Sequence, residues 1–574
     1  MAFQISPGVN VSEIDLTTVI PSVQTTAGAF AGGFVWGPAN LRTSVDSEIT
    51  LVNKFGKPDN NTATSFFTAA SFLAYGNNLT VVRAIGANGF NAKANTVAPG
   101  VQIPNEVYNA YINTTDNGNA LGSFVARYPG ALGNSLTVSI IDSSSTFSTW
   151  NVNGVLVSSL FNGAPGTSNA AAQAGAANDE VHIVVVDAGG LFTGVKNTVL
   201  ETFPYLSKAV NSTDSLGNSN YYKTSIFNNS KYIYVADHPD YSNTKLSWGQ
   251  TLALGGSFAT LGNTATKSVT TALSGGTDDV PGTAGLQTAY QYFQSAEDID
   301  ISLVMTGGHS VVTQQWVIDN VVNTRKDCVA FVSPPSSAVV NQYGNEAANI
   351  LAWNTSLARS TSYAVADTGW KYMFDKYNNI YRYVPLNGDV AGLCVNTDTT
   401  NDPWFSPAGF NRGNIKNVVR LAYNPSKTDR DNLYAVGINP VVSFPGLGII
   451  LYGDKTLQAK PSAFDRINVR RLFIVLEKAI STAAKFSLFE FNDEFTRAQF
   501  VALVTPFLRD IQGRRGIYDF RVVCDTTNNT DQVVAANQFV GDIYVKPARS
   551  INFIQLNFVA VRTGVDFTEV VGKF

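Results

Sequence analysis

The sequence contains very few of the residues on which catalysis and metal binding usually depend. It has only three cysteines and three histidines among 574 residues. Cys328, Cys394 and Cys524 lie far apart, without the short spacing of a thiolate metal site or the density of a disulfide framework. We therefore predict three buried thiols in a reducing cytoplasm, where cysteine behaves as a small apolar residue.

The histidines offer little material for a catalytic triad or a metal cluster. Only His238 has acidic neighbours, Asp237 and Asp240, and three such residues in one short loop are more often solvated than bound to a cation. The phosphate-binding loop, the nucleophile elbow and the dinucleotide-binding glycine motif are all absent. The sequence therefore predicts no catalytic residue, no cofactor and no metal.

Long apolar runs and an excess of one charge are also missing. No uninterrupted apolar stretch reaches the roughly 18 residues of a membrane helix, and the amino terminus lacks the pattern of a secretory signal. Lysine and arginine total 39 against 43 acids, which gives a net charge of −4 and no field that would attract nucleic acid or an anionic membrane. We expect a soluble protein made inside a cell, without nucleic acid or membrane insertion among its functions.

The residues that are present describe a large globular chain. A length of 574 residues favours about three or four domains. Near the amino terminus, a buried strand is predicted from residue 30, then a helix over 65–75 and a strand over 80–85. This alternation indicates an α/β segment at residues 24–85. Residues 86–121 have no sustained period and read as a loop or a reduced insertion.

The middle of the chain divides into two further predicted parts. Residues 122–324 are rich in Ser, Thr, Gly and Asn, with strands predicted at 136–141, 182–187 and 301–305, and we expect an outer α+β domain. A helix over 311–323 feeds a buried strand at 328–332. Residues 325–426 are then the second part of the domain begun by 24–85.

The last part, residues 427–574, is about twice as densely charged as the rest, with 18 basic and 15 acidic side chains. Apolar spacing predicts a long amphipathic helix after the N-cap candidate Ser462, and a second helix over 500–511 that Pro506 should kink or break. Strands are predicted at 520–524, 542–545 and 551–561. The overall expectation is a multidomain α+β or α/β fold with discontinuous, nested domains.

Both chain ends have the character of extended arms. Pro7-Gly8 excludes a helix from residues 1–23, and polar and apolar residues alternate through the segment. The tail from residue 565 to 574 has no core of its own. An isolated strand leaves its backbone N–H and C=O groups unpaired, and adding it to the sheet of another chain satisfies them. The predicted inter-subunit residues of the two arms are Val9, Val11, Ile14, Leu16, Val565, Phe567 and Val570.

Arginines concentrate in the predicted carboxy-terminal helices. They could form a patch for an acidic partner surface, although a solvated helix face is the better reading of any single one. The candidates are Arg466, Arg470, Arg471, Arg514 and Arg515.

Several sequence blocks together resemble one family of structural proteins. They occur in the family's order, at both ends and through most of the chain after residue 325: Ser6-Pro7-Gly8-Val9, residues 34–38 (FVWGP), Tyr128-Pro129-Gly130, residues 371–378 (KYMFDKYN), residues 452–456 (YGDKT), residues 464–472 (FDRINVRRL) and residues 546–552 (KPARSIN). In these blocks the chain is similar to the tail sheath proteins of contractile-tailed bacteriophages, the myoviruses.

That resemblance implies a layout and a function. The amino-terminal arm and residues 427–574 would form an inner, tube-facing domain, residues 24–85 and 325–426 a middle domain, and residues 122–324 an outer domain, with the outermost insertion of longer members absent or reduced at 86–121. Subunits of the family stack as hexameric rings in a helix around the tail tube, between baseplate and tail terminator, and contract to drive the tube through the host envelope. A virion protein assembled in the bacterial cytoplasm is implied.

Two other functions remain open at this point. The chain could be the sheath of a cellular contractile injection system, which side-chain chemistry does not distinguish from a phage sheath. Alternatively, the aromatic content and the Ser/Thr/Asn-rich loops of residues 122–300 could belong to a carbohydrate-binding or receptor-binding tail protein. The first predicts rings or tubes, and the second predicts sugar binding.

Overall fold

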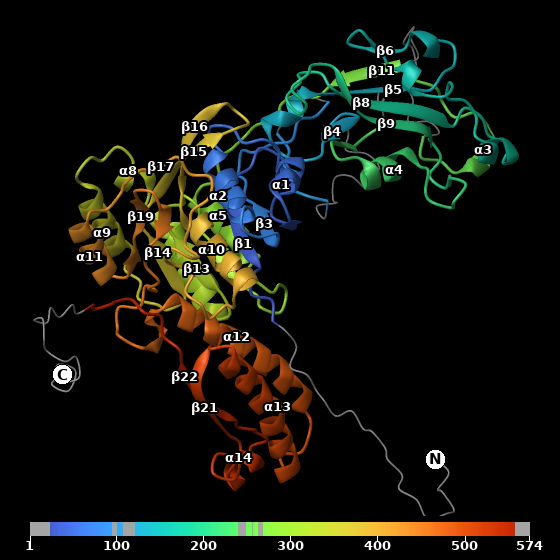
Figure 1. Cartoon of the computed structure of the whole chain (residues 1–574). Coiled ribbons are helices and arrows are strands. Elements are labelled where there is room, and N and C mark those ends of the chain that lie inside the picture. The colour runs from blue at the N-terminus through green and yellow to red at the C-terminus, as the bar shows by residue number, and fades with distance from the viewer. Residues whose placement is uncertain are drawn as a thin grey trace, which may run out of the picture. The chain divides into compact units, whose positions relative to one another are not determined.

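The structure, a computed structural model, describes residues 23–94, 100–106, 121–238, 248–254, 256–261 and 268–556. These residues form two compact units (Figure 1). The large unit contains the described residues up to 403 together with 407–482. The small unit contains residues 404–406 and 483–556.

The large unit is built on a seven-stranded sheet that is parallel except at one edge. Its strands lie in the order β18 (Ile438–Asn439), β14 (Ala364–Asp367), β13 (Val329–Val332), β12 (Leu303–Met305), β1 (Gly28–Gly32), β3 (Leu79–Arg83) and β2 (Arg42–Val45). Only β2 runs antiparallel to its neighbour. All five residues of β1 are buried, as expected for a parallel strand that is covered on both faces.

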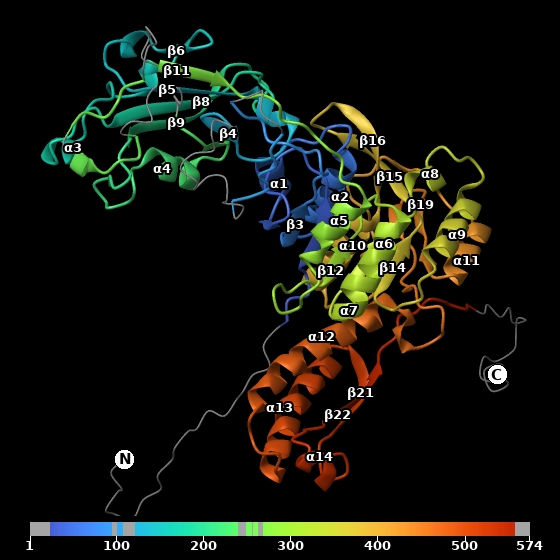
Figure 2. The same cartoon turned by 180° about the vertical axis from the view of Figure 1, so that it is seen from behind.

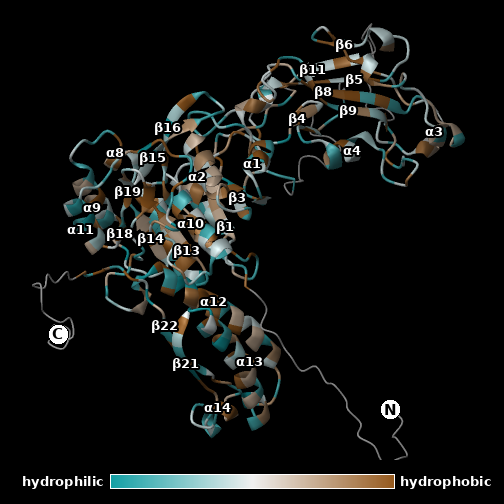
Figure 3. Ribbon diagram, in the orientation of Figure 1, coloured by the Kyte–Doolittle hydropathy of each residue, from teal (hydrophilic) through white to brown (hydrophobic). Residues whose placement is uncertain are grey.

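Helices cover both faces of this sheet (Figures 1 and 2). One face packs on α2 (Ala63–Leu73) and α10 (Asn387–Thr400), and eight of the 11 residues of α2 are buried. The other face packs on α5 (Thr283–Gln291), α6 (Val311–Val317) and α9 (Glu346–Leu357), with α11 (Lys427–Ala435) against α9. Figure 3 shows the hydrophobic colour of the central strands β13 and β14 between these layers.

A long insertion separates the two halves of the parallel sheet. The chain leaves after β3 and returns at β12, and between them it forms a four-stranded antiparallel sheet in the order β11 (Ser268–Ala272), β5 (Leu136–Ile141), β8 (Glu180–Asp187) and β9 (Thr198–Ser207). Smaller elements accompany it: β4 (Phe124–Ala126) with β10 (Ile233–Val235), β6 (Asn151–Val152) with β7 (Val155–Leu156), α3 (Asn169–Gln173) and α4 (Tyr222–Asn229).

The remaining elements of the large unit extend its central part. They are α1 (Glu48–Phe55), α7 (Asn323–Arg325), α8 (Ser336–Val339), the sheet of β15 (Trp370–Asp375), β16 (Ile380–Pro385) and β17 (Arg420–Leu421), the hairpin of β19 (Val441–Phe444) and β20 (Gly448–Leu451), and α12 (Ile467–Ala484), which begins in this unit. The small unit holds α13 (Glu494–Gly513), β21 (Ile517–Val523), α14 (Asp531–Ala535) and β22 (Asp542–Pro547).

The predicted fold class, a multidomain mixture of helices and sheets, is confirmed. The insertion gives the large unit the discontinuous, nested character that we predicted. Most predicted strands are present, and β5 covers the predicted residues 136–141 from end to end. In residues 86–94 and 100–106, within the predicted loop, the structure has only isolated bridges.

The boundaries between the structural parts of the chain differ from the predicted domain boundaries. β12 and α6, placed by the sequence in the outer domain that ends at 324, belong to the parallel sheet and its cover. Residues from 427 to 482 complete the same sheet, because β18 pairs with β14 at Ala366 and Ile438. The small unit therefore begins near residue 483, not at 427.

Three local predictions in the last part of the chain differ from the structure. Ser462 caps a short 3₁₀ turn, and α12 begins later, at Ile467. α13 runs through Pro506 without a break; Ala502, whose carbonyl loses its partner to the proline, is exposed to water. Residues 551–556 form no strand, and the rest of the strand predicted over 551–561 lies outside the described residues.

Candidate assembly surface

The small unit is built around one face of α13. Asp493 is the N-cap of the helix, and its carboxylate accepts a 2.8 Å hydrogen bond from the Thr496 backbone N–H. Phe500, Val504 and Leu508 are spaced four residues apart and, with Ile511, bury a single stripe. Trp404, Ile517 and Cys524 add to this stripe, and the apolar core of the unit is small.

Strands β21 and β22 form the only sheet of the small unit in its described part (Figure 1). They pair antiparallel from Ile517 with Pro547 to Val523 with Asp542, with a bulge between Ile517 and Asp519. Each strand has no second neighbouring strand among the described residues, so the outer edge of each is open to a further strand. Such edges readily pair with another chain, and two strands alone are marginally stable in water.

Large apolar side chains are also exposed in the small unit. The connection between α12 and α13, together with the first turn of α13, exposes four phenylalanines and a leucine, here called the aromatic cluster: Phe486, Leu488, Phe489, Phe491 and Phe495, with Phe489 fully exposed. After β22, Ile551, Phe553, Ile554 and Leu556 are at least 71% exposed. Soluble monomers rarely expose so many apolar groups together, which indicates contact surfaces. We did not predict the aromatic cluster; its sequence signal is FSLFEF, apolar residues without a helical period.

Three of the five candidate arginines are held inside the large unit. Arg471 makes hydrogen bonds of 2.8 and 2.5 Å to the Asp398 carboxylate, and each side chain is only 4% exposed. Burial alone would lower the pKa of Arg471, but the Asp398 carboxylate more than offsets this and raises it. Arg470 lies 4.3 and 4.0 Å from the ring centres of Tyr363 and Phe464.

Arg466 is 3.7 Å from the Asp454 carboxylate. Arg470 and Arg471 are therefore structural cations of the large unit and present no charge to a partner. Helical spacing assigned them to a polar face; their partners, Asp398 on α10 and Tyr363, are distant in sequence and could not be read from it.

Arg514 and Arg515 are different, because both are exposed at the carboxyl end of α13. Arg514 lies 3.5 Å from Asp510 and 5.1 Å from the Trp404 ring, and the Arg515 side chain forms no ion pair with the residues that the structure describes. The structure thus does not bring the five candidates together: three lie in the large unit and two in the small one.

The predicted arm residues lie outside the described part of the chain. These are Val9, Val11, Ile14 and Leu16 before residue 23, and Val565, Phe567 and Val570 after residue 556. Their role in joining subunits stays a prediction.

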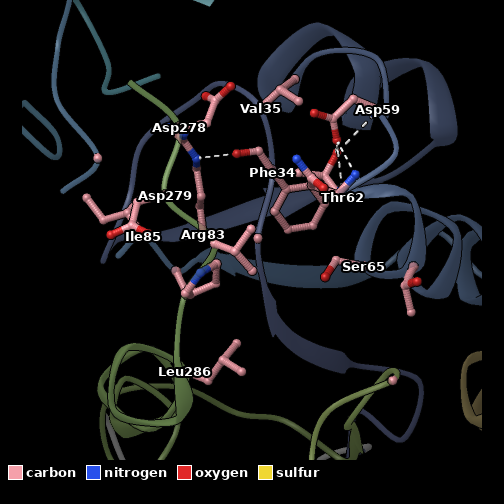
Figure 4. A pocket seen from close by; sticks show the side chains of 18 of the residues that line it. Phe34, Val35, Asp59, Thr62, Ser65, Arg83, Ile85, Asp278, Asp279 and Leu286 are labelled. Atoms are coloured by element: carbon pink, nitrogen blue, oxygen red, sulfur yellow. Dashed lines mark hydrogen bonds between the residues drawn. The ribbon is translucent and has the colours of Figure 1, made fainter. Parts of the chain in front are cut away.

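A cavity of 290 Å³ lies at the carboxyl ends of β1, β3 and β12 (Figure 4). Arg83 lines it, but its guanidinium donates to the carbonyls of Phe34, Gly37 and Pro129 at 2.7–2.8 Å. His309 is buried against the backbone carbonyl of Ala31 at 2.7 Å, and burial lowers its pKa to about 4. These hydrogen bonds join segments that are distant in sequence, so Arg83 and His309 have structural roles at this cavity.

Neither a metal site nor a membrane span is found in the described ranges. No three or more His, Cys, Asp or Glu side chains there gather as a metal site would require. None of the helices described has the length and apolar character to cross a membrane.

Comparison with known proteins identifies the family to which this chain belongs. A family model described as the phage tail sheath protein central domain matches residues 282–457, and one described as the phage tail sheath C-terminal domain matches residues 459–560. The tail sheath protein of Vibrio phage KVP40 is 35% identical over 673 aligned residues, covering 99% of this chain and 100% of that protein. The tail sheath protein of Enterobacteria phage T4 is 33% identical over 657 residues, covering 99% of each.

Solved structures agree at the level of the fold. The sheath tail protein of Listeria innocua superimposes with a TM-score of 0.53 at 13% identity, covering 92% of this chain and 93% of that one. The sheath tail protein of Desulfitobacterium hafniense gives a TM-score of 0.50 at 9% identity, with 91% and 94% covered. The chain therefore belongs to the phage tail sheath proteins, and it is a subunit of a contractile tail sheath.

Proposed function

We propose that this sheath subunit polymerises by strand addition at the β21–β22 sheet, as hexameric rings stacked in a helix around the tail tube. The observation that carries the proposal is the two-stranded sheet with two unpaired edges in the small unit. The arms that would fill these edges in neighbouring copies are residues 1–23 and the tail from 565, which follow the alternating pattern of strands.

Strand addition suits a sheath that changes length. Backbone hydrogen bonds between chains do not depend on the side chains at the joint, so rigid units can turn about flexible connections while the ladder stays bonded. Contacts of this head-to-tail kind extend into rings or helices instead of closing as a dimer. The protein is then a structural part of the virion, and contraction would draw its free energy from repacking an assembly, without a nucleotide.

The partners follow from this role. They are further copies of the chain, the tail tube protein inside the rings, and the baseplate and tail terminator proteins at the ends, assembled in the host cytoplasm. Among the arginines first considered, Arg514 and Arg515 are the exposed candidates for contact with the tube, since Arg470 and Arg471 are buried and Arg466 lies beside Asp454.

The decisive experiment removes backbone hydrogen-bond donors from the amino-terminal arm and leaves the rest of the arm unchanged. Val9→Pro with Val11→Pro removes two N–H donors that a strand needs, whereas the matched control Val9→Thr with Val11→Thr keeps both donors and a β-branched shape. Electron microscopy of purified protein should show monomers for the proline variant and rings or tubes for the control. A proline variant that assembles like the parent chain contradicts strand addition by this arm.

Deleting residues 566–574 tests the other arm in the same assay. We expect a folded chain that no longer assembles. Deletions of residues 1–20 and of 566–574 that both assemble normally would refute the proposal for both ends.

A further inference from the structure

The small unit has opposite charges at its two ends. α13 is 20 residues long, so about 30 Å separate its ends. β21 runs back along the helix from Ile517 to Val523, and β22 returns from Asp542 to Pro547. Val523 and Asp542 therefore lie toward the start of α13, and Ile517 and Pro547 lie toward its other end.

The acidic end surrounds the start of α13. Asn492 ties two segments together there, donating to Asn529 Oδ1 at 3.1 Å and to the Gln538 carbonyl at 2.8 Å. Acidic side chains crowd this end, all exposed: Glu490, Asp493, Glu494, Asp525 and Asp531. The basic side chains at this end are Arg497, which is half-buried and bonded to Asn492, and the exposed Lys485 and Arg521, so the acids remain in excess.

The basic end surrounds the other end of α13. The Trp404 indole N–H donates to the Arg514 carbonyl at 3.0 Å, and the Ala548 N–H donates to the Gly516 carbonyl at 3.1 Å. Basic side chains gather here, again exposed: Arg509, Arg514, Arg515, Lys546 and Arg549. The acids at this end are Asp510 and Asp519.

Exposed aromatic rings accompany the acidic side chains. The rings of Phe489, Phe491 and Phe495 are 104%, 84% and 74% exposed, and all three belong to the acidic end. Guanidinium groups stack on aromatic faces and pair with carboxylates, so an arginine-rich surface complements both features at once.

We propose that the acidic, aromatic end of the small unit binds the basic end of the small unit in a second copy of this chain. The two ends of one body complement each other, so each copy has the surface that its neighbour needs. A foreign partner such as the tube would engage only one end and leave the other unexplained. The contact is heterologous, and it repeats from copy to copy.

This contact rests on the proposed function, since it operates in a polymer of subunits, but it is separate from strand addition. Strand addition uses backbone groups at the edges of the sheet, whereas this contact uses side chains at the ends of the body. The arms would link neighbours, and the charged ends would set the direction in which neighbours stack.

Charge reversal provides a test with its own rescue. The variant Glu490→Lys with Glu494→Lys carries two basic ends, and the variant Arg509→Glu with Arg515→Glu carries two acidic ends. Each alone should need more than about tenfold higher concentration to assemble, because exposed pairs are worth up to about a factor of five each and turn repulsive. An equimolar mixture should assemble near the parent concentration, as the two variants alternate.

The matched control reverses two exposed lysines of the large unit, Lys196→Glu with Lys427→Glu, and should assemble like the parent chain. Sedimentation and electron microscopy measure assembly, and circular dichroism checks folding. If both charge-reversed variants assemble alone as well as the parent, or if the mixture fails to recover, the contact is refuted. If Arg509→Glu with Arg515→Glu instead loses binding to the tube protein but self-assembles like the parent, the basic end binds the tube and the contact between copies is refuted. If the parent itself never assembles, strand-mediated polymerisation fails first, which is a distinguishable result.

Discussion

Removing one partner of the buried ion pair between Arg471 and Asp398 should strongly destabilise the large unit. Both side chains are 4% exposed and two hydrogen bonds join them. Replacing Asp398 with Leu leaves a buried guanidinium unpaired, which costs about 3–5 kcal/mol in free energy of unfolding. Changing Arg471 to Met as well removes the stranded charge, so the double variant should be more stable than Asp398→Leu alone by at least about 2 kcal/mol.

Urea unfolding followed by tryptophan fluorescence measures this cycle well. Six of the seven tryptophans lie in the large unit, and only Trp404 lies in the small one. The control cycle uses Arg359 and Asp319, a pair with side chains 31% and 41% exposed, and should give a coupling below about 1 kcal/mol.

The outcome separates two roles for Arg471. A structural cation gives strongly non-additive single variants. A surface arginine reserved for a partner would give additive changes, with Asp398→Leu costing no more than about 0.5 kcal/mol. Additive behaviour of the pair would therefore refute the reasoning that removed Arg471 from the assembly surface.

Three further outcomes are expected. Burial raises the pKa of Asp367 from 3.8 to about 8, so the folded chain keeps a proton that the unfolded chain has lost, and the free energy of unfolding should fall as pH rises from about 4 to about 8. Asp367→Asn should weaken this pH dependence in urea titrations at pH 5 and pH 8. Equal pH dependence in the parent and the variant would contradict the assignment. Gly37→Ala should destabilise the large unit by about 1–3 kcal/mol, because Gly37 has φ of 93° and an added Cβ would lie 2.4 Å from the Lys54 carbonyl oxygen; a thermal melt unchanged from the parent would be the opposing result. Leu508→Ala should cost the small unit about 2–5 kcal/mol and reduce assembly, as limited proteolysis and electron microscopy would report, whereas the exposed control Ala502→Ser should change neither.

Local periodicity was enough to predict many of the strands and helices. The apolar run over 136–141 and the helical spacing at 65–75 correspond to β5 and α2, because burial on a strand or helix repeats every two or about 3.6 residues. The cap at Ser462 was placed wrongly, since its hydroxyl accepts from Phe464 N–H in a 3₁₀ turn and the helix starts five residues later. A short-range signal marked the right region but not the right element.

Long-range pairing was beyond the reach of the sequence. The change in charge density at 427 suggested a domain boundary, yet β18 joins β14 across more than seventy residues and carries 427–482 into the large unit. Arg470 and Arg471 looked like a polar helix face for the same reason. Their ring and carboxylate partners come from Tyr363 and Asp398, which only the fold brings near.

The contrast between the two units explains where function lies in this chain. The large unit satisfies its buried cations internally, as Arg471 with Asp398 and Lys371 with Asp389 show, so it can move as a rigid body. In its described part the small unit has a thin core, two open strand edges and an exposed aromatic cluster, which other copies cover in the proposed assembly. Its stability must therefore increase with the concentration of its partners. In the proposed assembly the large unit is held together by its own contacts and the small unit is completed by neighbouring copies, so the joints between copies, and not a pocket, would store and release the free energy of contraction.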